Sequence, residues 1–211
     1  MKTSRLLPLV LFALLVLAAP TRAGQESGDT TLSRMPAIGT SAPDFTLPDA
    51  HTGKARSLRA FARAKRPVAL FFFCGCPACH AVATEWAMLQ CGNALPPTTA
   101  TVIVYSTTDR AEARARVAAS GLDKRRTAVL CDTEDLSVTE GLYHAEPCPR
   151  LFVVDPAGKV VYANTGDDDV TFAGDGDRSK PQEAPAGLLV ARALSALQSN
   201  VSAKTQEDAA P

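Results

Sequence analysis

The sequence lacks a surplus of charge of either sign, because its 22 Lys and Arg residues balance 22 Asp and Glu residues. Proteins that bind nucleic acid through its phosphates need a basic surface, so we expect no nucleic-acid partner. The chain has 211 residues, of which 46% are hydrophobic. This length and composition predict one domain with a sizeable core.

A membrane-spanning length of apolar sequence is missing at the N-terminus. Positive charge at Lys2 and Arg5 precedes an apolar run from Leu6 to Ala19, which is shorter than the about 20 residues of a spanning helix. Small residues flank Arg22, as at a cleavage site. We therefore predict a secretory signal at 1–23 and a periplasmic or secreted protein; an uncleaved signal would instead anchor it. No cysteine lies near the cleavage site to accept a lipid.

The acidic stretch after Gly166 lacks the spacing of a calcium loop. Its aspartates do not follow the EF-hand pattern and no Glu completes it; they are Asp167, Asp168, Asp169, Asp175 and Asp177. We predict a solvated loop there. Along the rest of the chain we expect a polar linker at 24–36, a folded domain at 37–198 and a disordered tail at 199–211.

The most informative stretch joins a buried strand to a helix. The apolar run from Val68 to Phe73 is short and continuous, and a Gly and a Pro follow it at once, which is typical of a buried strand. Pro suits the first position of a helix, and the stretch from Ala78 to Gln90 has no internal Gly or Pro. Cys76 is therefore predicted at the N-terminus of a helix, with Cys79 one turn further on.

This position gives Cys76 the chemistry of a nucleophile. Free N–H groups and the positive end of the helix dipole stabilise an anion, so we expect Cys76 to form a thiolate at neutral pH. A thiolate attacks a disulfide, and the second thiol of a C-x-x-C pair then releases the product. Cys76 is the candidate nucleophile and Cys79 the candidate resolving thiol. An inert disulfide between them is the alternative.

Strands and helices alternate along the chain. A short strand near Phe45 turns at Gly53 and leads to a helical turn from Ser57 to Ala64. Further strands are predicted at 101–106 and 128–131, helices at 109–120 and 136–143, a hairpin at 151–162 and a last helix from 185 to about 198. This order predicts an α/β fold, with a mixed central sheet flanked by helices.

With C-x-x-C between the first central strand and its helix, this order of elements resembles the thioredoxin superfamily. Within it the chain is similar to the exported TlpA/ResA-like thiol-disulfide oxidoreductases of the redoxin (AhpC/TSA) group, which also includes peroxiredoxins. The resemblance covers residues 39–163 and rests on separate motifs at 39–53, 71–79 and 151–160. It implies a thioredoxin-like fold and no bound cofactor.

The resemblance also implies a cis proline beside the active site, where Pro149 stands. A cis bond there would expose the preceding backbone to a substrate strand; an ordinary trans proline is the alternative. Cys148 directly precedes Pro149, and with a cis bond its sulfur is expected near Cys76. Cys148 is therefore a candidate accessory redox thiol or relay, with a packed free thiol as the alternative.

Other positions depart from the family pattern. TlpA-like proteins usually have a large aromatic residue where this chain has Gly75. We expect the small Gly75 to open the approach to the nucleophile. Cys74 is predicted to be a buried residue at the strand end, and Cys91 and Cys131 to be either a structural pair or two core thiols. All six cysteines lie in the exported part, and an exported protein meets an oxidising compartment in which disulfides persist.

A peroxide reductase is the first alternative function. In the redoxin group these antioxidant enzymes hold one reactive thiolate in a P-x-x-x-T-x-x-C loop and activate it with an arginine. Aligned on Cys79, the loop places Phe72 at its Pro and Cys76 at its Thr. The arginine position falls on Pro149, with Arg150 one residue later. These mismatches argue against a dedicated peroxidase.

Haem or metal binding is the second alternative. The stretch from Cys76 to His80 satisfies the C-x-x-C-H pattern of haem attachment, for which Met88 or His144 would be the distal ligand. A metal ion would instead be held by Cys74, Cys76, Cys79 and His80, as in exported copper chaperones. Those proteins usually space their cysteines as C-x-x-x-C, which this sequence does not have.

The function predicted from the sequence is thiol-disulfide exchange with protein substrates outside the cytoplasm. The resemblance implies a reductive role, such as keeping client cysteines reduced for cofactor attachment, with electrons from a membrane partner. We expect a monomer. A proton acceptor for Cys79 is also expected, and Glu85, Asp44 and Glu146 are open candidates. The Pro-Ala pair between the cysteines does not fix the direction of exchange.

Overall fold

A computed structural model of the chain describes residues 34–164 and 185–207. The predicted signal at 1–23, most of the linker and the acidic loop lie outside the described residues. Within those two ranges, no helix is both long and apolar enough to cross a membrane.

A mixed five-stranded sheet forms the centre of the fold, in the order β5-β4-β3-β6-β7. Its parallel strands are β3 (Val68–Phe73), β4 (Ala100–Tyr105) and β5 (Thr127–Cys131); β6 (Arg150–Val154) runs antiparallel to β3, and β7 (Val160–Ala163) antiparallel to β6. Every residue of β3 to β6 is buried, which explains the continuous apolar runs. The predicted α/β fold with a mixed sheet is confirmed.

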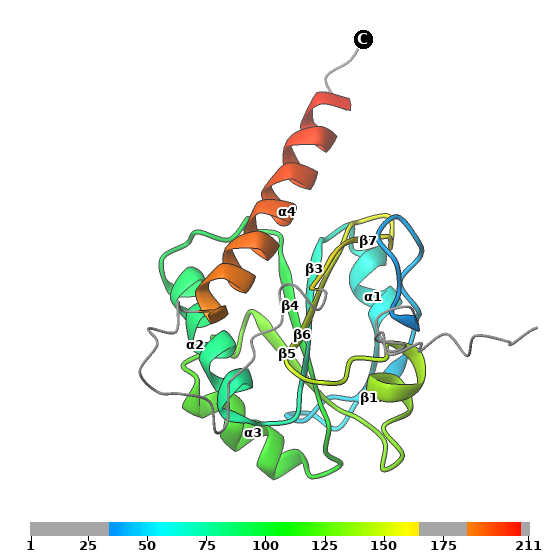
Figure 1. Ribbon diagram of the computed structural model, residues 1–211, viewed down its shortest axis with the longest axis vertical. Coiled ribbons are helices and arrows are strands. Elements are labelled where there is room, and N and C mark those ends of the chain that lie inside the picture. The colour runs from blue at the N-terminus through cyan, green and yellow to red at the C-terminus, as the bar shows by residue number, and fades with distance from the viewer. Residues whose placement is uncertain (1–33, 165–184, 208–211) are drawn as a thin grey trace, which may run out of the picture.

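Helices cover both faces of this sheet (Figure 1). On one face lie α2 (Pro77–Cys91), α3 (Arg110–Ala119) and α4 (Pro185–Glu207); on the other lie α1 (Leu58–Arg63), the hairpin of β1 (Thr46–Pro48) and β2 (Ala55–Ser57), and the short π-helix η2 (Ser137–Leu142). Because side chains alternate across a strand, Phe71 packs on Trp86 of α2, whereas Phe72 packs on Tyr143 and Phe152.

The helices begin where the sequence predicts. The side chain of Ser57 caps α1, and that of Asp109 caps α3 by accepting hydrogen bonds from two backbone amides. Cys76 occupies the same capping position on α2, with Pro77 directly after it. Side-chain acceptors at these positions satisfy N–H groups that have no partner within the helix.

Two predicted boundaries are wrong. Met35 was assigned to the linker, but its side chain is buried in the same cluster as Phe45 and Leu47. The last helix does not end near Gln198, because α4 continues to Glu207 and projects beyond the sheet (Figure 1). No Gly or Pro follows Gly187 within it to stop the helix, so residues 199–207 are not a disordered tail.

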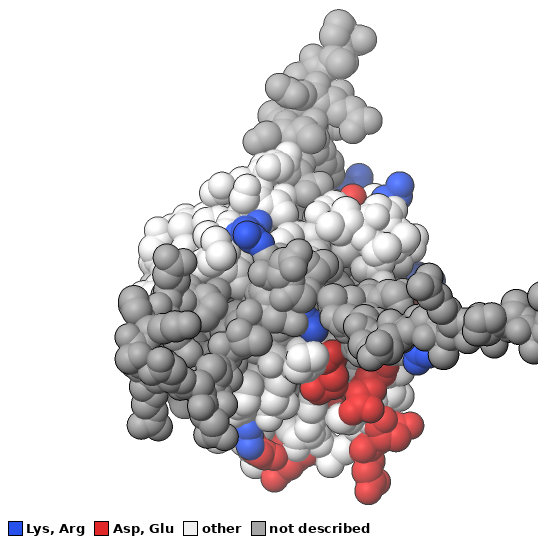
Figure 2. Space-filling model, in the orientation of Figure 1, with Lys and Arg blue, Asp and Glu red and all other residues white. Residues whose placement is uncertain are grey.

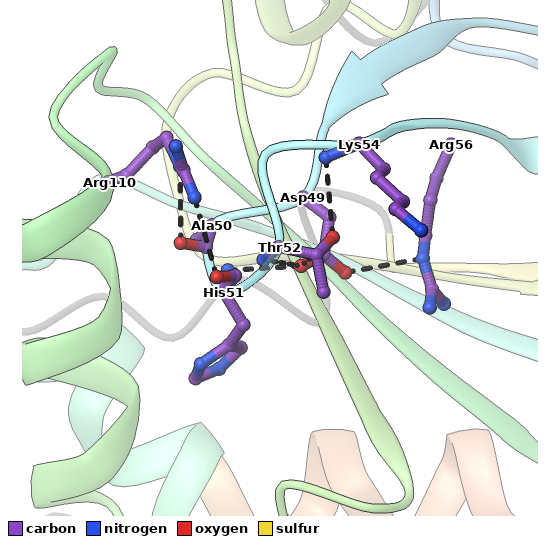
Figure 3. A network of polar contacts seen from close by, with 7 residues as sticks. All are labelled: Asp49, Ala50, His51, Thr52, Lys54, Arg56 and Arg110. Carbon is purple, nitrogen blue, oxygen red and sulfur yellow. Dashed lines mark hydrogen bonds and ion pairs between the residues drawn. The ribbon is translucent and has the colours of Figure 1, made fainter.

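The loop between β1 and β2 fastens this hairpin to the sheet and to α3 (Figure 3). The Asp49 carboxylate accepts hydrogen bonds from two backbone amides of the loop and pairs with Arg56 at 3.2 Å. The amide of Ala50 donates to the Val129 carbonyl in β5, and Arg110 of α3 donates to the Ala50 carbonyl, as Figure 3 shows. The loop is therefore held from three sides.

Candidate active site

The candidate site forms where the end of β3 meets the start of α2 and of β6. Because β6 runs antiparallel to β3, its first residue Arg150 pairs with Phe72, one residue before the end of β3. The segment that precedes β6 therefore lies beside the turn that follows β3. This places Cys148 and Pro149 next to the C-x-x-C pair.

Cys76 caps α2, as the sequence predicts. Its backbone is extended, with φ −68° and ψ 166°, and its Sγ accepts a hydrogen bond from the Cys79 amide at 3.5 Å. The side chain is partly exposed. The sulfur therefore lies at the amide end of α2 and is accessible from outside the protein.

Cys79 has the opposite environment. Its side chain has no exposed area, and its Sγ lies 3.4 Å from that of Cys76. Two causes raise the pKa of Cys79 to about 12: burial is the larger, and the neighbouring Cys76 is the second. Cys79 therefore stays a protonated thiol beside the more exposed sulfur, which is the arrangement expected of a resolving thiol.

The Cys148–Pro149 peptide bond is cis, as the resemblance implied, and the preceding Glu146–Pro147 bond is also cis. Buried Asn164 fixes this segment: its side chain accepts a hydrogen bond from the Leu151 amide at 2.6 Å and donates one to the Pro149 carbonyl at 3.4 Å. Sequence reasoning missed Asn164, because an Asn just after a strand is typical of an ordinary turn.

Cys74 and Cys148 form a disulfide, which the sequence analysis did not predict. The prediction that Cys74 is a buried strand-end residue is wrong, because its side chain is exposed just past the end of β3. The packed free thiol considered for Cys148 is wrong as well. Its expected proximity to Cys76 is confirmed, with the two Sγ atoms 3.9 Å apart.

Arg116 of α3 fills the space left by the missing side chain at Gly75. Gly75 has a φ of +88°, and a Cβ built on it would overlap the Arg116 guanidinium. Arg116 also donates a hydrogen bond to the Cys74 carbonyl at 3.1 Å. Instead of opening the approach to Cys76, as predicted, Gly75 admits a cation. No sequence signal indicates this, because Arg116 pairs with Glu112 at i, i+4 like an ordinary surface residue.

The remaining two cysteines are not a pair. Cys91, the last residue of α2, is an exposed free thiol, and Cys131, the last residue of β5, is a buried free thiol. Of the two predicted alternatives, the structural pair is wrong and the core thiol applies to Cys131 alone.

Of the three candidate proton acceptors, only Glu146 lies at the edge of the site. Asp44 pairs with Arg59 of α1, on the other face of the sheet, and Glu85 lies nearly two turns beyond Cys79 on α2. The Glu146 carboxylate accepts a hydrogen bond from the Cys148 amide, while burial and then the nearby Glu140 raise its pKa. Acidic side chains gather in the lower part of the face shown in Figure 2.

The structure replaces the predicted set of metal ligands. The sulfurs of Cys74, Cys76, Cys79 and Cys148 lie within 4.8 Å of one another. His80 is not among them, because its Nδ1 lies 3.1 Å from the Ser120 hydroxyl. Four thiolates suit a soft metal ion, and the Cys74–Cys148 bridge must be reduced before they are available. Haem attachment is not supported, because the Cys79 sulfur that would form a thioether is fully buried.

Arg150 does not take the place of the arginine that activates a peroxide-reducing thiolate. It pairs directly with Phe72 across the β3–β6 ladder, so the two side chains share a face. Phe72 packs with Tyr143, whereas Cys79 belongs to the cluster on the opposite face. The β3–β6 register therefore directs Arg150 towards the face opposite Cys79, which argues against this role.

Comparison with known proteins agrees with this architecture. Residues 38–163 match the AhpC/TSA family. Similar solved structures include a putative thiol:disulfide interchange protein DsbE from Chlorobium tepidum (23% identity, 75% of this chain and 99% of that one, TM-score 0.52). Another is peroxidoxin BcpB from Mycobacterium tuberculosis (19% identity, 78% of this chain and 97% of that one, TM-score 0.53). A third is the thioredoxin domain of a Bacteroides vulgatus thiol-disulfide oxidoreductase (21% identity, 62% of this chain and 91% of that one, TM-score 0.51). No curated protein matches the chain. The predicted thioredoxin-like fold is confirmed.

Proposed function

Because the chain belongs to the AhpC/TSA family, we propose that it is a thiol-disulfide oxidoreductase in which Cys76 is the nucleophile and Cys79 the resolving thiol. The start of α2 carries this proposal. There the partly exposed Cys76 sulfur accepts a hydrogen bond from a backbone N–H, and the sulfur of buried Cys79 lies 3.4 Å from it. The thiol-disulfide oxidoreductases among the similar structures support it.

The reaction takes place in two exchanges. The Cys76 thiolate attacks one sulfur of a substrate disulfide; the substrate S–S bond breaks, and the other sulfur leaves as a thiolate that takes a proton from water. Cys79 then gives its proton to water and attacks the Cys76 sulfur, and the second substrate sulfur leaves as a thiolate that takes a proton from water. The Cys76–Cys79 disulfide forms and the second substrate thiol is released. Two electrons pass to the substrate, and an external dithiol restores the pair.

Pro149 is proposed to position the substrate. The residue before it, Cys148, lies beside Cys76, and the Asn164 side chain donates a hydrogen bond to the Pro149 carbonyl. A substrate segment in extended conformation would pair with the backbone next to Pro149, which adds main-chain hydrogen bonds to the covalent contact. Protein disulfides are therefore the proposed substrates.

The same proposal includes a reductive role outside the cytoplasm, as a monomer supplied with electrons by a membrane protein. The charged and apolar pattern at 1–23 supports export, and the Cys74–Cys148 disulfide fits an oxidising compartment. Titration of the Cys76–Cys79 potential tests the direction. A value near about −270 mV supports reduction, and one near about −120 mV would mark an oxidase.

Peroxide reduction is the second candidate, because the similar structures include a peroxidoxin. Two observations weigh against it: Cys79 is buried with a raised pKa, and Arg150 lies on the other face of the sheet. We expect slow consumption of hydrogen peroxide. Consumption that survives Cys76→Ser but is abolished by Cys79→Ser would reverse the assignment of the two cysteines.

The proposed function is tested by the rate at which the protein catalyses the reduction of insulin with dithiothreitol as the electron donor. The turbidity of the precipitating insulin chains reports this rate. We expect Cys76→Ser to lose at least about 100-fold in rate, because the sulfur proposed to attack the substrate is gone. Cys79→Ser should accumulate a mixed disulfide with insulin. Cys91→Ser is the matched control, since Cys91 is a free thiol at the far end of α2. Full activity of Cys76→Ser would contradict the proposal.

A further inference from the structure

We propose that the Cys74–Cys148 disulfide is redox-active and exchanges directly with the Cys76/Cys79 dithiol. This inference rests on the proposed function and deepens it. The bridge links the residue after β3 to the residue before Pro149, across 74 positions of sequence. It thereby lies against the sulfurs that carry out the proposed chemistry.

Each sulfur of the bridge has its own neighbour in the C-x-x-C pair. The Sγ of Cys148 lies 3.9 Å from that of Cys76, and the Sγ of Cys74 lies 4.0 Å from that of Cys79. These distances are slightly longer than the about 3–3.5 Å of a near-attack arrangement. A small rotation of the partly exposed Cys76 side chain shortens the first of them. A purely structural disulfide does not require further cysteine sulfurs next to its own two sulfurs.

The local backbone explains how four sulfurs meet. The positive φ of Gly75 turns the chain between Cys74 and Cys76, so both sulfurs reach the same side of the turn. The antiparallel pairing of β6 with β3 brings Cys148, which precedes Pro149 and β6, to this turn. The two additional cysteines thus stand at the two backbone features that frame the nucleophile.

In the first exchange the Cys76 thiolate, which has given its proton to water, attacks the Cys148 sulfur. The Cys76–Cys148 bond forms, the Cys74–Cys148 bond breaks, and Cys74 leaves as a thiolate. Arg116 brings a positive charge to the residue that carries this leaving group, because its guanidinium donates to the Cys74 backbone carbonyl at 3.1 Å. The positive charge favours the departing anion.

In the second exchange the Cys74 thiolate accepts the proton of Cys79, whose sulfur is 4.0 Å away. Cys79 then attacks Cys76 at 3.4 Å, forms the Cys76–Cys79 disulfide and releases Cys148 as a thiolate, which takes a proton from water. Two electrons have moved from one pair to the other, and no outside oxidant is needed. In this exchange between the pairs, Cys74 is therefore the proton acceptor for Cys79.

The site would therefore store four electrons rather than two. Cys74 is exposed and Cys148 is partly exposed, so an external dithiol can also enter at the bridge. Electrons received at one pair would leave from the other.

The Cys79→Ser variant, oxidised at the bridge and kept without substrate, tests the first exchange. Here Cys76 can attack Cys148, but nothing resolves the product. We expect acid quenching, alkylation and peptide mass spectrometry to reveal a Cys76–Cys148 linkage with alkylated Cys74, increasing between about pH 6 and pH 9. Cys79→Ser combined with Cys91→Ser is the control and should give the same linkage. Only Cys74–Cys148 peptides at every pH would overturn the proposal.

A second measurement uses the unmodified chain. Fully oxidised protein treated with one equivalent of dithiothreitol, and fully reduced protein treated with one equivalent of oxidised dithiothreitol, are quenched over time. Exchange predicts that the two single-disulfide forms reach the same ratio from both sides. Two different ratios that persist would show that the bridge is inert.

Parallel insulin reduction by the wild-type protein separates this inference from the proposed function. Insulin reduction without any exchange between the pairs overturns the inference alone. Exchange between the pairs without insulin reduction supports the inference and overturns the proposed function.

Discussion

The two cysteines of the C-x-x-C pair are one helical turn apart and differ strongly in burial. Cys76 is partly exposed and receives the amide of Cys79, whereas the Cys79 side chain has no exposed area. Attack on a protein disulfide needs an accessible sulfur, and resolution needs only a sulfur that reaches its neighbour. The environment of each residue therefore supports the proposed roles.

Cys79 should resist alkylation in the folded, reduced protein up to about pH 10, because its pKa is raised to about 12. The raised pKa favours folding while the thiol is protonated, and this contribution is lost as the pH rises from about 9 towards 12. The extent of Cys79 alkylation is measured by iodoacetamide labelling at pH 7, 8.5 and 10 and peptide mass spectrometry. Exposed Cys91 is the internal control. Equal labelling of Cys79 and Cys91 at pH 8.5 would refute the assignment.

Substitution of Gly75 tests the contact with Arg116. Gly75→Ala and Gly158→Ala both place a Cβ on a positive φ, of +88° and +83°, which costs about 1–2 kcal/mol. Only Gly75→Ala also displaces a neighbour, since nothing lies within 4 Å at Gly158. We expect Gly75→Ala to lower the free energy of unfolding by about 1 kcal/mol more, as measured by urea denaturation.

The same comparison in an Arg116→Ala background isolates the contact. There the two glycine substitutions should cost the same, because the guanidinium is gone. A difference that persists without Arg116 would show that something other than this side chain sets the cost at Gly75.

At the scale of elements, the loop between β1 and β2 depends on one buried carboxylate. The Asp49 side chain is 5% exposed and Arg56 is 44% exposed. Asp49→Ala leaves two loop amides without their acceptor, so we expect a loss of about 1–3 kcal/mol in the free energy of unfolding. Arg56→Ala, the control, should cost less than about 1 kcal/mol. Equal costs from chemical denaturation would mean that the ion pair, not the loop, stabilises the hairpin.

Regular elements were predictable because their signals are local. The apolar run at Val68–Phe73 and the cap at Asp109 define a strand and a helix within a few residues, and the structure has both. The end of α4 was not predictable from polarity alone, since polar residues continue a helix when no Gly or Pro interrupts it.

The candidate site was predictable only where it is local in sequence. The capping position of Cys76 and the cis bond at Pro149 follow from motifs. The Cys74–Cys148 bridge and the position of Arg116 depend on how distant segments pack. Cysteine number alone does not determine pairing, and the spacing of an arginine on an exposed helix does not reveal what it covers.

At the scale of the whole molecule, α4 completes the core on the side of the sheet that holds the site. Leu197 of α4 has no exposed area, whereas Leu188 of the same helix is 55% exposed. Leu197→Ala should lower the free energy of unfolding by about 2–5 kcal/mol through lost packing. Leu188→Ala should change it by less than about 0.5 kcal/mol. Thermal and urea unfolding measure both; a small effect of Leu197→Ala would mean that α4 is dispensable for the fold.

The most direct test of the account compares two sulfurs on the same helix. Cys76 caps the start of α2 and Cys91 is its last residue, and Cys91 is the more exposed. In fully reduced protein at pH 7, the account predicts that iodoacetamide alkylates Cys76 at least about tenfold faster than Cys91, since the helix N-terminus favours the thiolate. Alkylation of Cys76 at the same rate as Cys91, or more slowly, would contradict the claim that this sulfur is the nucleophile.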